Sequence, residues 1–207
     1  MKIKFLLILL ILAFFVNPAF AVRPTPPPPT PNSVCIDAGH GGSDTGTVNG
    51  SLQEKNVNLD TAIMLRDKLA SAGSYTVFMT RVNDVSLSNA DRYNYCNSQK
   101  AAILISIHHN GSSNPTVDYA TALYMKKSDK ALADLVATKV SATLGLPKNP
   151  ISSFASGVLL KSNMPAAISE GFFLTNSSEY TFLTASSDRL SQESDALLSA
   201  INSYFGK

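Results

Sequence analysis

Residues 101–110 read Ala-Ala-Ile-Leu-Ile-Ser-Ile-His-His-Asn. The first seven residues of this stretch are almost wholly apolar, which is typical of a central strand in a parallel sheet that is covered on both faces. Two histidines follow at once, at the carboxyl end of the predicted strand. Ligands of open α/β sheets bind outside the carboxyl ends of the strands, so the sequence predicts a functional site at this end.

Strands and helices alternate on both sides of this central run. Shorter apolar runs predict strands at residues 34–37, 75–80, 120–125, 157–160 and 166–169. Apolar spacings of three and four residues, together with one polar segment, predict helices at residues 54–73, 88–99, 132–140 and 190–205. The alternation predicts a single α/β domain, with a mostly parallel, twisted sheet flanked by helices on both faces.

The amino-terminal residues predict export. Lys2 and Lys4 precede an apolar run, and Ala19-Phe20-Ala21 carries the small residues that signal peptidase recognises. We therefore expect residues 1–21 to be a signal peptide, residues 22–32 a proline-rich linker, and residues 33–207 one folded domain. A retained membrane anchor is disfavoured, because the apolar run is shorter than the roughly 20 residues that span a bilayer.

Removal of the predicted signal peptide leaves a formally neutral chain. The full sequence has 17 basic and 15 acidic residues, and Lys2 and Lys4 depart with the signal peptide. A neutral protein has no strong electrostatic attraction for nucleic acid or anionic lipid. We expect neither as a partner.

Cys35 and Cys96 are the only cysteines. In an oxidising compartment they could form a disulfide, which would stabilise the fold by roughly 4 kcal/mol through loop entropy. The alternative is two buried thiols, Cys35 in a strand and Cys96 in a helix. Of the two, we expect the thiols, and the spacing does not match a zinc ribbon.

All three histidines follow predicted strands, His40 the first strand and His108 and His109 the central one. A catalytic zinc ion takes three protein ligands, typically histidine nitrogens and a carboxylate oxygen, and keeps a fourth position for water. Strand ends of one parallel sheet lie side by side. These histidines therefore indicate a metal site at that edge.

Two choices in this site stay open on spacing alone. Glu54 can be the third ligand, because its helix leaves the His40 loop, or it can close a Ser51-x-x-Glu54 capping box. Consecutive residues of a strand face opposite sides, so only one of His108 and His109 can reach a given metal ion. Spacing does not say which one.

Two further acids are candidates for a role in the chemistry. Glu170 follows the predicted strand 166–169 among apolar residues, where burial would raise its pKa and suit it to proton transfer. Its alternative role is a buried ion pair with a basic residue such as Lys161. Asp37 is a candidate to orient a ligand histidine or to accept a backbone hydrogen bond at its strand end.

Five segments of the chain form one recognisable series. They are Asp-Ala-Gly-His-Gly-Gly-Ser-Asp-Thr-Gly at 37–46, Glu-Lys and Asn-Leu at 54–59, residues 80–92, Ser-Ile-His-His-Asn at 106–110, and residues 164–176. In this order, and over residues 34–205, the chain resembles the zinc-dependent N-acetylmuramoyl-L-alanine amidases of the amidase 3 family. The departures are Cys96, where a small residue is usual, and Ser169, where an apolar one is common.

The resemblance implies a role for each candidate residue. It makes His40, Glu54 and His108 the ligands of one zinc ion and Glu170 the general base, and it leaves His109 without a role. The implied reaction hydrolyses the amide between N-acetylmuramic acid and L-alanine of the peptidoglycan stem peptide. An exported zinc peptidase that cuts within the stem peptide, and a wall-binding protein without activity, are the competing hypotheses.

The resemblance also bears on location and regulation. We expect a monomer that acts on peptidoglycan in the periplasm or after secretion, without stable membrane insertion. The stretch from Asn110 to Ser128 is too short for the inhibitory helix of some relatives. We therefore expect the purified domain to be active by itself, although a divisome-type activator remains an alternative.

Overall fold

The structure is a computed structural model that describes residues 28–186 and 188–207. The predicted signal peptide and most of the predicted linker lie outside this range. Thr30, near the end of the linker, donates its backbone N–H to the Lys100 carbonyl at 2.8 Å. Within the described residues, no helix has both the length and the apolar character needed to cross a membrane.

One six-stranded sheet organises the described chain, in the order β4-β1-β5-β8-β6-β7. Its strands are β1 (Ser33–Ala38), β4 (Thr76–Met79), β5 (Ile103–Asn110), β6 (Thr121–Tyr124), β7 (Ser152–Ser153) and β8 (Ala166–Phe173). Strands β4, β1, β5 and β8 are parallel, and β6 runs antiparallel to β8. The predicted central strand is therefore confirmed, since β5 lies between β1 and β8.

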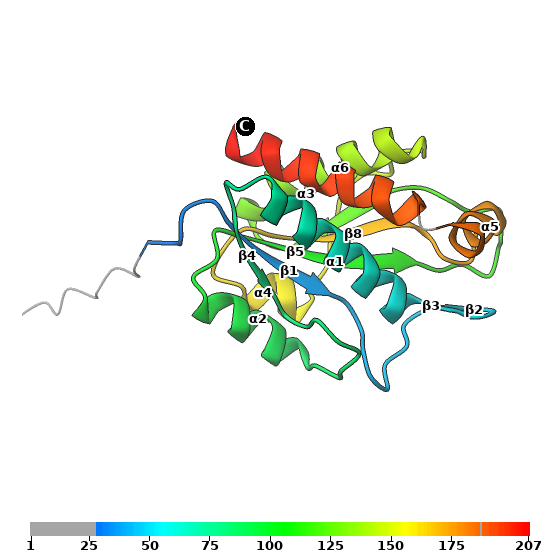
Figure 1. The fold of residues 1–207 in the computed structure, drawn as a ribbon, viewed down its shortest axis with the longest axis horizontal. Coiled ribbons are helices and arrows are strands. Elements are labelled where there is room, and N and C mark those ends of the chain that lie inside the picture. Colours follow the sequence, from blue (N-terminus) through cyan, green and yellow to red (C-terminus); the bar gives the residue numbers. More distant parts are fainter. Residues whose placement is uncertain (1–27, 187) are drawn as a thin grey trace, which may run out of the picture.

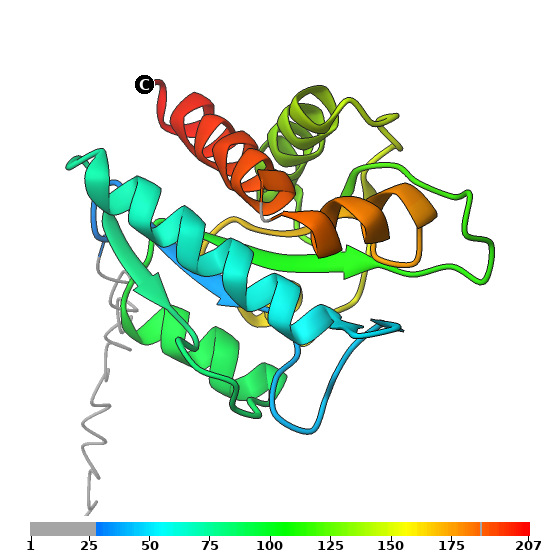
Figure 2. The same ribbon diagram turned by 45° about the vertical axis from the view of Figure 1, so that its right-hand side comes forward.

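Helices cover both faces of the sheet, as the α/β prediction requires (Figure 1). One face carries α1 (Glu54–Ser71), α3 (Lys130–Leu144) and α6 (Asp188–Phe205), and the other carries α2 (Asn89–Ser98) and α4 (Gly157–Lys161). Helices α3 and α6 lie side by side (Figure 2). The sequence did not predict the β2 (Val48–Asn49)–β3 (Leu52–Gln53) hairpin, a 3₁₀ turn (Lys127–Asp129) or α5 (Ser177–Ala185).

The side chains of β5 alternate between the two helical layers. Ile103, Ile105 and Ile107 are fully buried in the core beneath α1, α3 and α6, whereas Leu104 belongs to the smaller core beneath α2 and α4. Full burial of one such side chain contributes about 1.5–3 kcal/mol, so a one-residue slip in register would be costly. This alternation fixes the directions of the polar residues that follow.

The predicted strand at residues 157–160 is wrong, because these residues form helix α4. The hydroxyl of Ser156 caps this helix by accepting the N–H of Val158 at 3.2 Å. Four apolar residues are too few to distinguish a strand from a buried helical turn by periodicity. The burial of Val158 and Leu159, with Leu160 about half exposed, fits the helix.

The expectation of two free thiols is also wrong. Cys35 in β1 and Cys96 in α2 form a disulfide, with their Cα atoms 5.8 Å apart. Both residues are fully buried in the core that α2 shares with the sheet. The bond therefore ties the first strand to the helix that covers it.

We predict that replacement of both cysteines, Cys35→Ala with Cys96→Ala, lowers the free energy of unfolding by roughly 4 kcal/mol. The cross-link spans 61 residues, and a loop of that length restricts the unfolded chain by about this amount. Denaturant unfolding with and without a reductant measures the effect. A wild-type protein whose stability does not respond to the reductant would contradict the prediction.

Candidate metal centre

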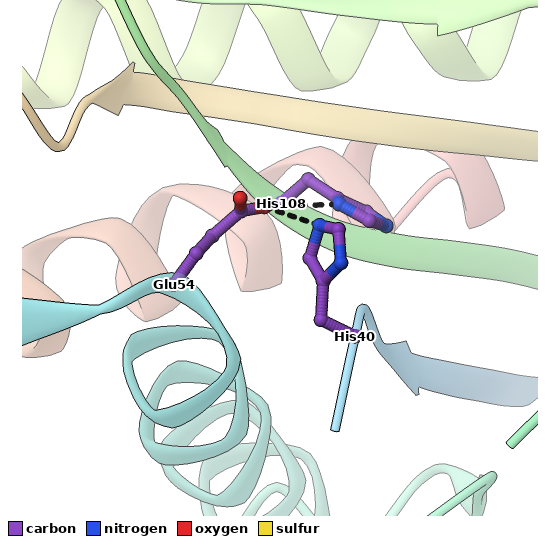
Figure 3. Close-up of side chains that lie close together, drawn as sticks. All are labelled: His40, Glu54 and His108. Atoms are coloured by element: carbon purple, nitrogen blue, oxygen red, sulfur yellow. Dashed lines mark hydrogen bonds and ion pairs between the residues drawn. The ribbon is translucent and has the colours of Figure 1, made fainter. Parts of the chain in front are cut away.

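Three side chains from three separate elements converge at the carboxyl edge of the sheet (Figure 3). His40 comes from the loop after β1, Glu54 from the first turn of α1, and His108 from β5. Glu54 Oε1 lies 3.1 Å from His40 Nε2 and 3.0 Å from His108 Nδ1. The structure thus brings together the three residues that the family resemblance implies as zinc ligands.

This cluster fits a zinc ion. One potential ligand atom from each residue lies within 4.8 Å of the other two. In a tetrahedral site with bonds of about 2.1 Å, neighbouring ligand atoms are about 3.4 Å apart, close to the distances here. Two imidazoles and one carboxylate are also a donor set of catalytic zinc sites.

Glu54 does not close a capping box. Helix α1 begins at Glu54 itself, and its preceding residue, Gln53, makes no side-chain cap. Instead Glu54 Oε2 accepts the N–H of Thr47 at 2.9 Å, which turns the carboxylate towards the histidines. Burial alone would raise the pKa of Glu54, but the hydrogen bonds from His108 and His40 outweigh it and lower that pKa strongly.

The His40 loop is held in a sparsely populated conformation. His40 has a φ of 59°, in the left-handed region that few residues other than glycine adopt. Gly39 cannot carry a side chain, because its Cβ would lie 2.2 Å from His108 Nε2. Strained backbone of this kind persists where surrounding contacts fix it.

Asp44 contacts the ring nitrogen of His40 that does not face Glu54, and so orients the ring. Its Oδ2 lies 2.9 Å from His40 Nδ1, which leaves Nε2 directed at Glu54. Burial would lower the pKa of His40, but Glu54 and Asp44 raise it to about 9. Metal binding must therefore displace a proton at neutral pH.

Asp37 does not contact a ligand histidine, so that sequence hypothesis is wrong. Its carboxylate accepts from Arg92 Nη1 at 2.8 Å, from the Ser106 hydroxyl at 2.6 Å and from the Thr80 hydroxyl at 2.6 Å. Arg92 in turn donates to the His40 carbonyl at 2.7 Å. Asp37 thus supports the His40 loop through an arginine.

Glu170 faces the same cavity as His40 and His108. The cavity has a volume of about 480 Å³, and its lining includes His40, Asp44, His108, Phe154 and Glu170. Burial raises the pKa of the Glu170 carboxyl, as expected from the sequence. Within the described part of the chain it forms no ion pair with Lys161, which is exposed. Strand β8 continues to Phe173, so Glu170 lies inside the strand rather than after it.

His109 points away from the cavity, as the alternation of strand side chains predicts. It is buried against Phe172, with ring centroids 4.2 Å apart. Its ring nitrogens face Asn58 of α1 and Glu193 of α6. These partners were not predicted, because they lie 51 and 84 residues away along the chain and no spacing pattern links them to His109.

The comparisons with known proteins identify the family. Residues 34–203 match the model of the N-acetylmuramoyl-L-alanine amidase family, amidase 3. The chain belongs to this amidase family. The match covers every residue of the candidate centre, from His40 to Glu170.

Individual relatives agree with this membership. The chain is 34% identical over 151 residues to the N-acetylmuramoyl-L-alanine amidase LytC of Bacillus subtilis, covering 71% of this chain and 30% of LytC. It is 30% identical over 203 residues to the germination-specific amidase of that organism, covering 87% of this chain and 85% of the relative. The catalytic domain of CwlV from Bacillus (Paenibacillus) polymyxa superposes with a TM-score of 0.80 at 27% identity, covering 84% of this chain and 98% of that domain. The chain therefore spans less than a third of LytC but nearly all of a solved amidase catalytic domain.

We predict that Asp37→Asn lowers the free energy of unfolding by about 3 kcal/mol or more at neutral pH. The change leaves the buried Arg92 guanidinium without its counter-charge. Burial alone would raise the pKa of Asp37, but Arg92 and the two hydroxyls lower it below 3.8. The stabilisation is therefore present above pH 3.8 and is lost as the pH falls through the folded-state pKa.

Urea unfolding of the wild type and the variant, with EDTA present so that metal release does not contribute, measures this difference against pH. It should shrink below about pH 4. A difference that stays constant over the acidic range would show that the Asp37 charge is not responsible.

Proposed function

We propose that this amidase hydrolyses the amide bond between the lactyl group of N-acetylmuramic acid and the L-alanine of the stem peptide. The observation that carries the proposal is the convergence of His40, Glu54 and His108 in a chain of this family. The two histidines line the same cavity as Glu170. Peptidoglycan is the corresponding macromolecular substrate.

His40, Glu54 and His108 would hold a single zinc ion. Such an ion lowers the pKa of water towards about 7 and polarises a carbonyl oxygen. Glu54 keeps its charge for this task, because the two histidines and the Thr47 N–H stabilise its ionised form. Asp44 holds the His40 ring with Nε2 turned towards Glu54.

Glu170 would act as the proton carrier. It lies beside His108 on the neighbouring strand, since the two residues are paired across β5 and β8. In the ionised form, Glu170 takes a proton from the attacking water, and it then donates that proton to the departing amine of L-alanine. Its raised pKa suits both steps, because a group that first takes and then gives a proton works best when its pKa is closer to the operating pH.

The proposed location follows from the sequence and the family. We propose export through the predicted signal peptide and action in the periplasm or outside the cell, as a monomer. The described residues between β5 and β6 contain no helix, which supports activity of the purified domain without an activator.

We predict that Glu170→Gln lowers kcat by about 10²- to 10⁴-fold while zinc binding is retained. The amide keeps the shape of the side chain but cannot take a proton. His40→Ala, as the matched variant, should instead lose zinc, because it removes a ligand. Metal analysis after dialysis and turnover on purified peptidoglycan separate the two effects. Full activity of Glu170→Gln would refute its role as general base.

We also predict the products of peptidoglycan digestion. Mass spectrometry should find free stem peptides that begin with L-alanine, together with glycan strands that carry no peptide. Shortened peptides still attached to the glycan would indicate a zinc peptidase instead. Binding without any cleavage, in a zinc-loaded preparation, would favour a wall-binding protein.

A further inference from the structure

A buried run of polar side chains lies behind the candidate metal centre, on the face of β5 opposite the cavity. It joins three elements: His109 of β5, Asn58 of α1 and Glu193 of α6. His109 Nδ1 lies 2.7 Å from Asn58 Oδ1, and His109 Nε2 lies 2.8 Å from Glu193 Oε2. His109 is 1% exposed, and Asn58 and Glu193 are fully buried.

The donors and acceptors fix the direction of this run. Asn58 Nδ2 donates to the Gly39 carbonyl at 3.2 Å and to Glu54 Oε1 at 3.4 Å. Because a carbonyl oxygen only accepts, the amide oxygen of Asn58 must face His109, and His109 Nδ1 must carry a proton. An ionised Glu193 also only accepts, so His109 Nε2 donates a second proton to Glu193 Oε2 in the charged pair. Glu193, at the opposite ring nitrogen, holds the imidazole in this orientation.

The run ends on the carboxylate that faces both ligand histidines. Glu54 Oε1 accepts the backbone N–H of His109 at 3.2 Å as well as the Asn58 amide. The Gly39 carbonyl, the second acceptor of Asn58, belongs to the residue directly before His40. Asn58 therefore contacts one candidate ligand, Glu54, and the backbone directly before another, His40.

Glu193 is not explained by packing. One of its oxygens, Oε1, is buried without a hydrogen-bond partner among the described residues. The space beside it exists only because residue 171 is glycine, whose Cβ would lie 2.1 Å from that oxygen. A buried charged pair is often no more stabilising than apolar side chains of similar volume, so stability gives no reason for this arrangement.

We propose that Glu193 and His109 are positioning residues for the metal centre. Acting through Asn58, they hold the Glu54 carboxylate and the Gly39 carbonyl in the arrangement that binds the ion. This inference rests on the zinc site proposed above. Groups that hydrogen-bond metal ligands fix the orientation of those ligands, and their loss typically weakens metal binding about 10- to 100-fold.

The double variant His109→Leu with Glu193→Leu tests the inference. It replaces the pair by apolar side chains, a change that buried ion pairs often tolerate without loss of stability, but it frees the Asn58 amide. We expect zinc affinity to fall about 10-fold or more, while the melting temperature of the metal-free protein stays the same or rises. Competition with a chromophoric chelator measures the affinity. An affinity within about threefold of the wild type would overturn the proposal.

Two matched variants accompany the double variant. Glu193→Gln should keep wild-type affinity, because its amide can donate to His109 Nε2 while Nδ1–H still faces Asn58. Ser194→Ala should keep it too, because Ser194 is also buried on α6 and its hydroxyl, among the described residues, bonds only to the Ser191 carbonyl. Equal loss of affinity in Glu193→Gln and the double variant would contradict positioning through these hydrogen bonds.

Two remaining outcomes are also decisive. If the double variant does not fold, Glu193→Met removes only the contact to Nε2, and an unchanged zinc affinity in that variant would overturn the inference. A wild-type protein that binds no zinc would refute the proposed metal site itself. If instead the wild type and the double variant bind zinc equally well, the metal site stands and only the positioning role of Glu193 and His109 is refuted.

Discussion

The carboxylate of Asp37 and the guanidinium of Arg92 meet inside the protein, with the two side chains only 1% and 6% exposed. Such a pair is costly to bury unless its remaining donors and acceptors are also satisfied. Here Arg92 donates to the carbonyls of Ala38 and His40, and two hydroxyls donate to Asp37. The pair therefore fixes the backbone that leaves β1, including the positive φ of His40. The direction of the His40 ring, and with it the metal centre, depends on this backbone.

The fold was largely predictable, because its signals are local. An almost wholly apolar run such as residues 101–107 is compatible with few positions other than the middle of a covered sheet. The prediction failed where the local signal was weak. Residues 157–160 are too short for their period to be read, and the capping hydroxyl of Ser156 decides in favour of a helix. The disulfide was not predicted, because cysteine spacing carries no information on whether a strand and a helix pack together.

The candidate site was predictable only in part. Strand ends place His40 and His108 near each other, since β1 and β5 are neighbours. Glu54 could not be assigned from spacing, because the sequence Ser51-x-x-Glu54 equally matches a capping box. What brings Glu54 to the sheet edge is the hairpin of β2 and β3, which the sequence did not predict. The supporting residues Asn58 and Glu193 come from two separate helices. Only the packing of the two helices on the sheet brings them to His109.

One irregularity in β8 allows Glu170 to face the cavity and Phe172 to face the opposite side of the sheet. Between His108 and Asn110 of β5 the pairing shifts, so that β8 has one residue more than its neighbour between Glu170 and Phe173. In a regular strand, Phe172 would face the same side as Glu170 and would compete for the cavity. The extra residue turns Phe172 to the opposite face, where its ring packs against His109. Glu170 can therefore face the cavity while, two residues later, the same strand closes the apolar wall around the buried histidine.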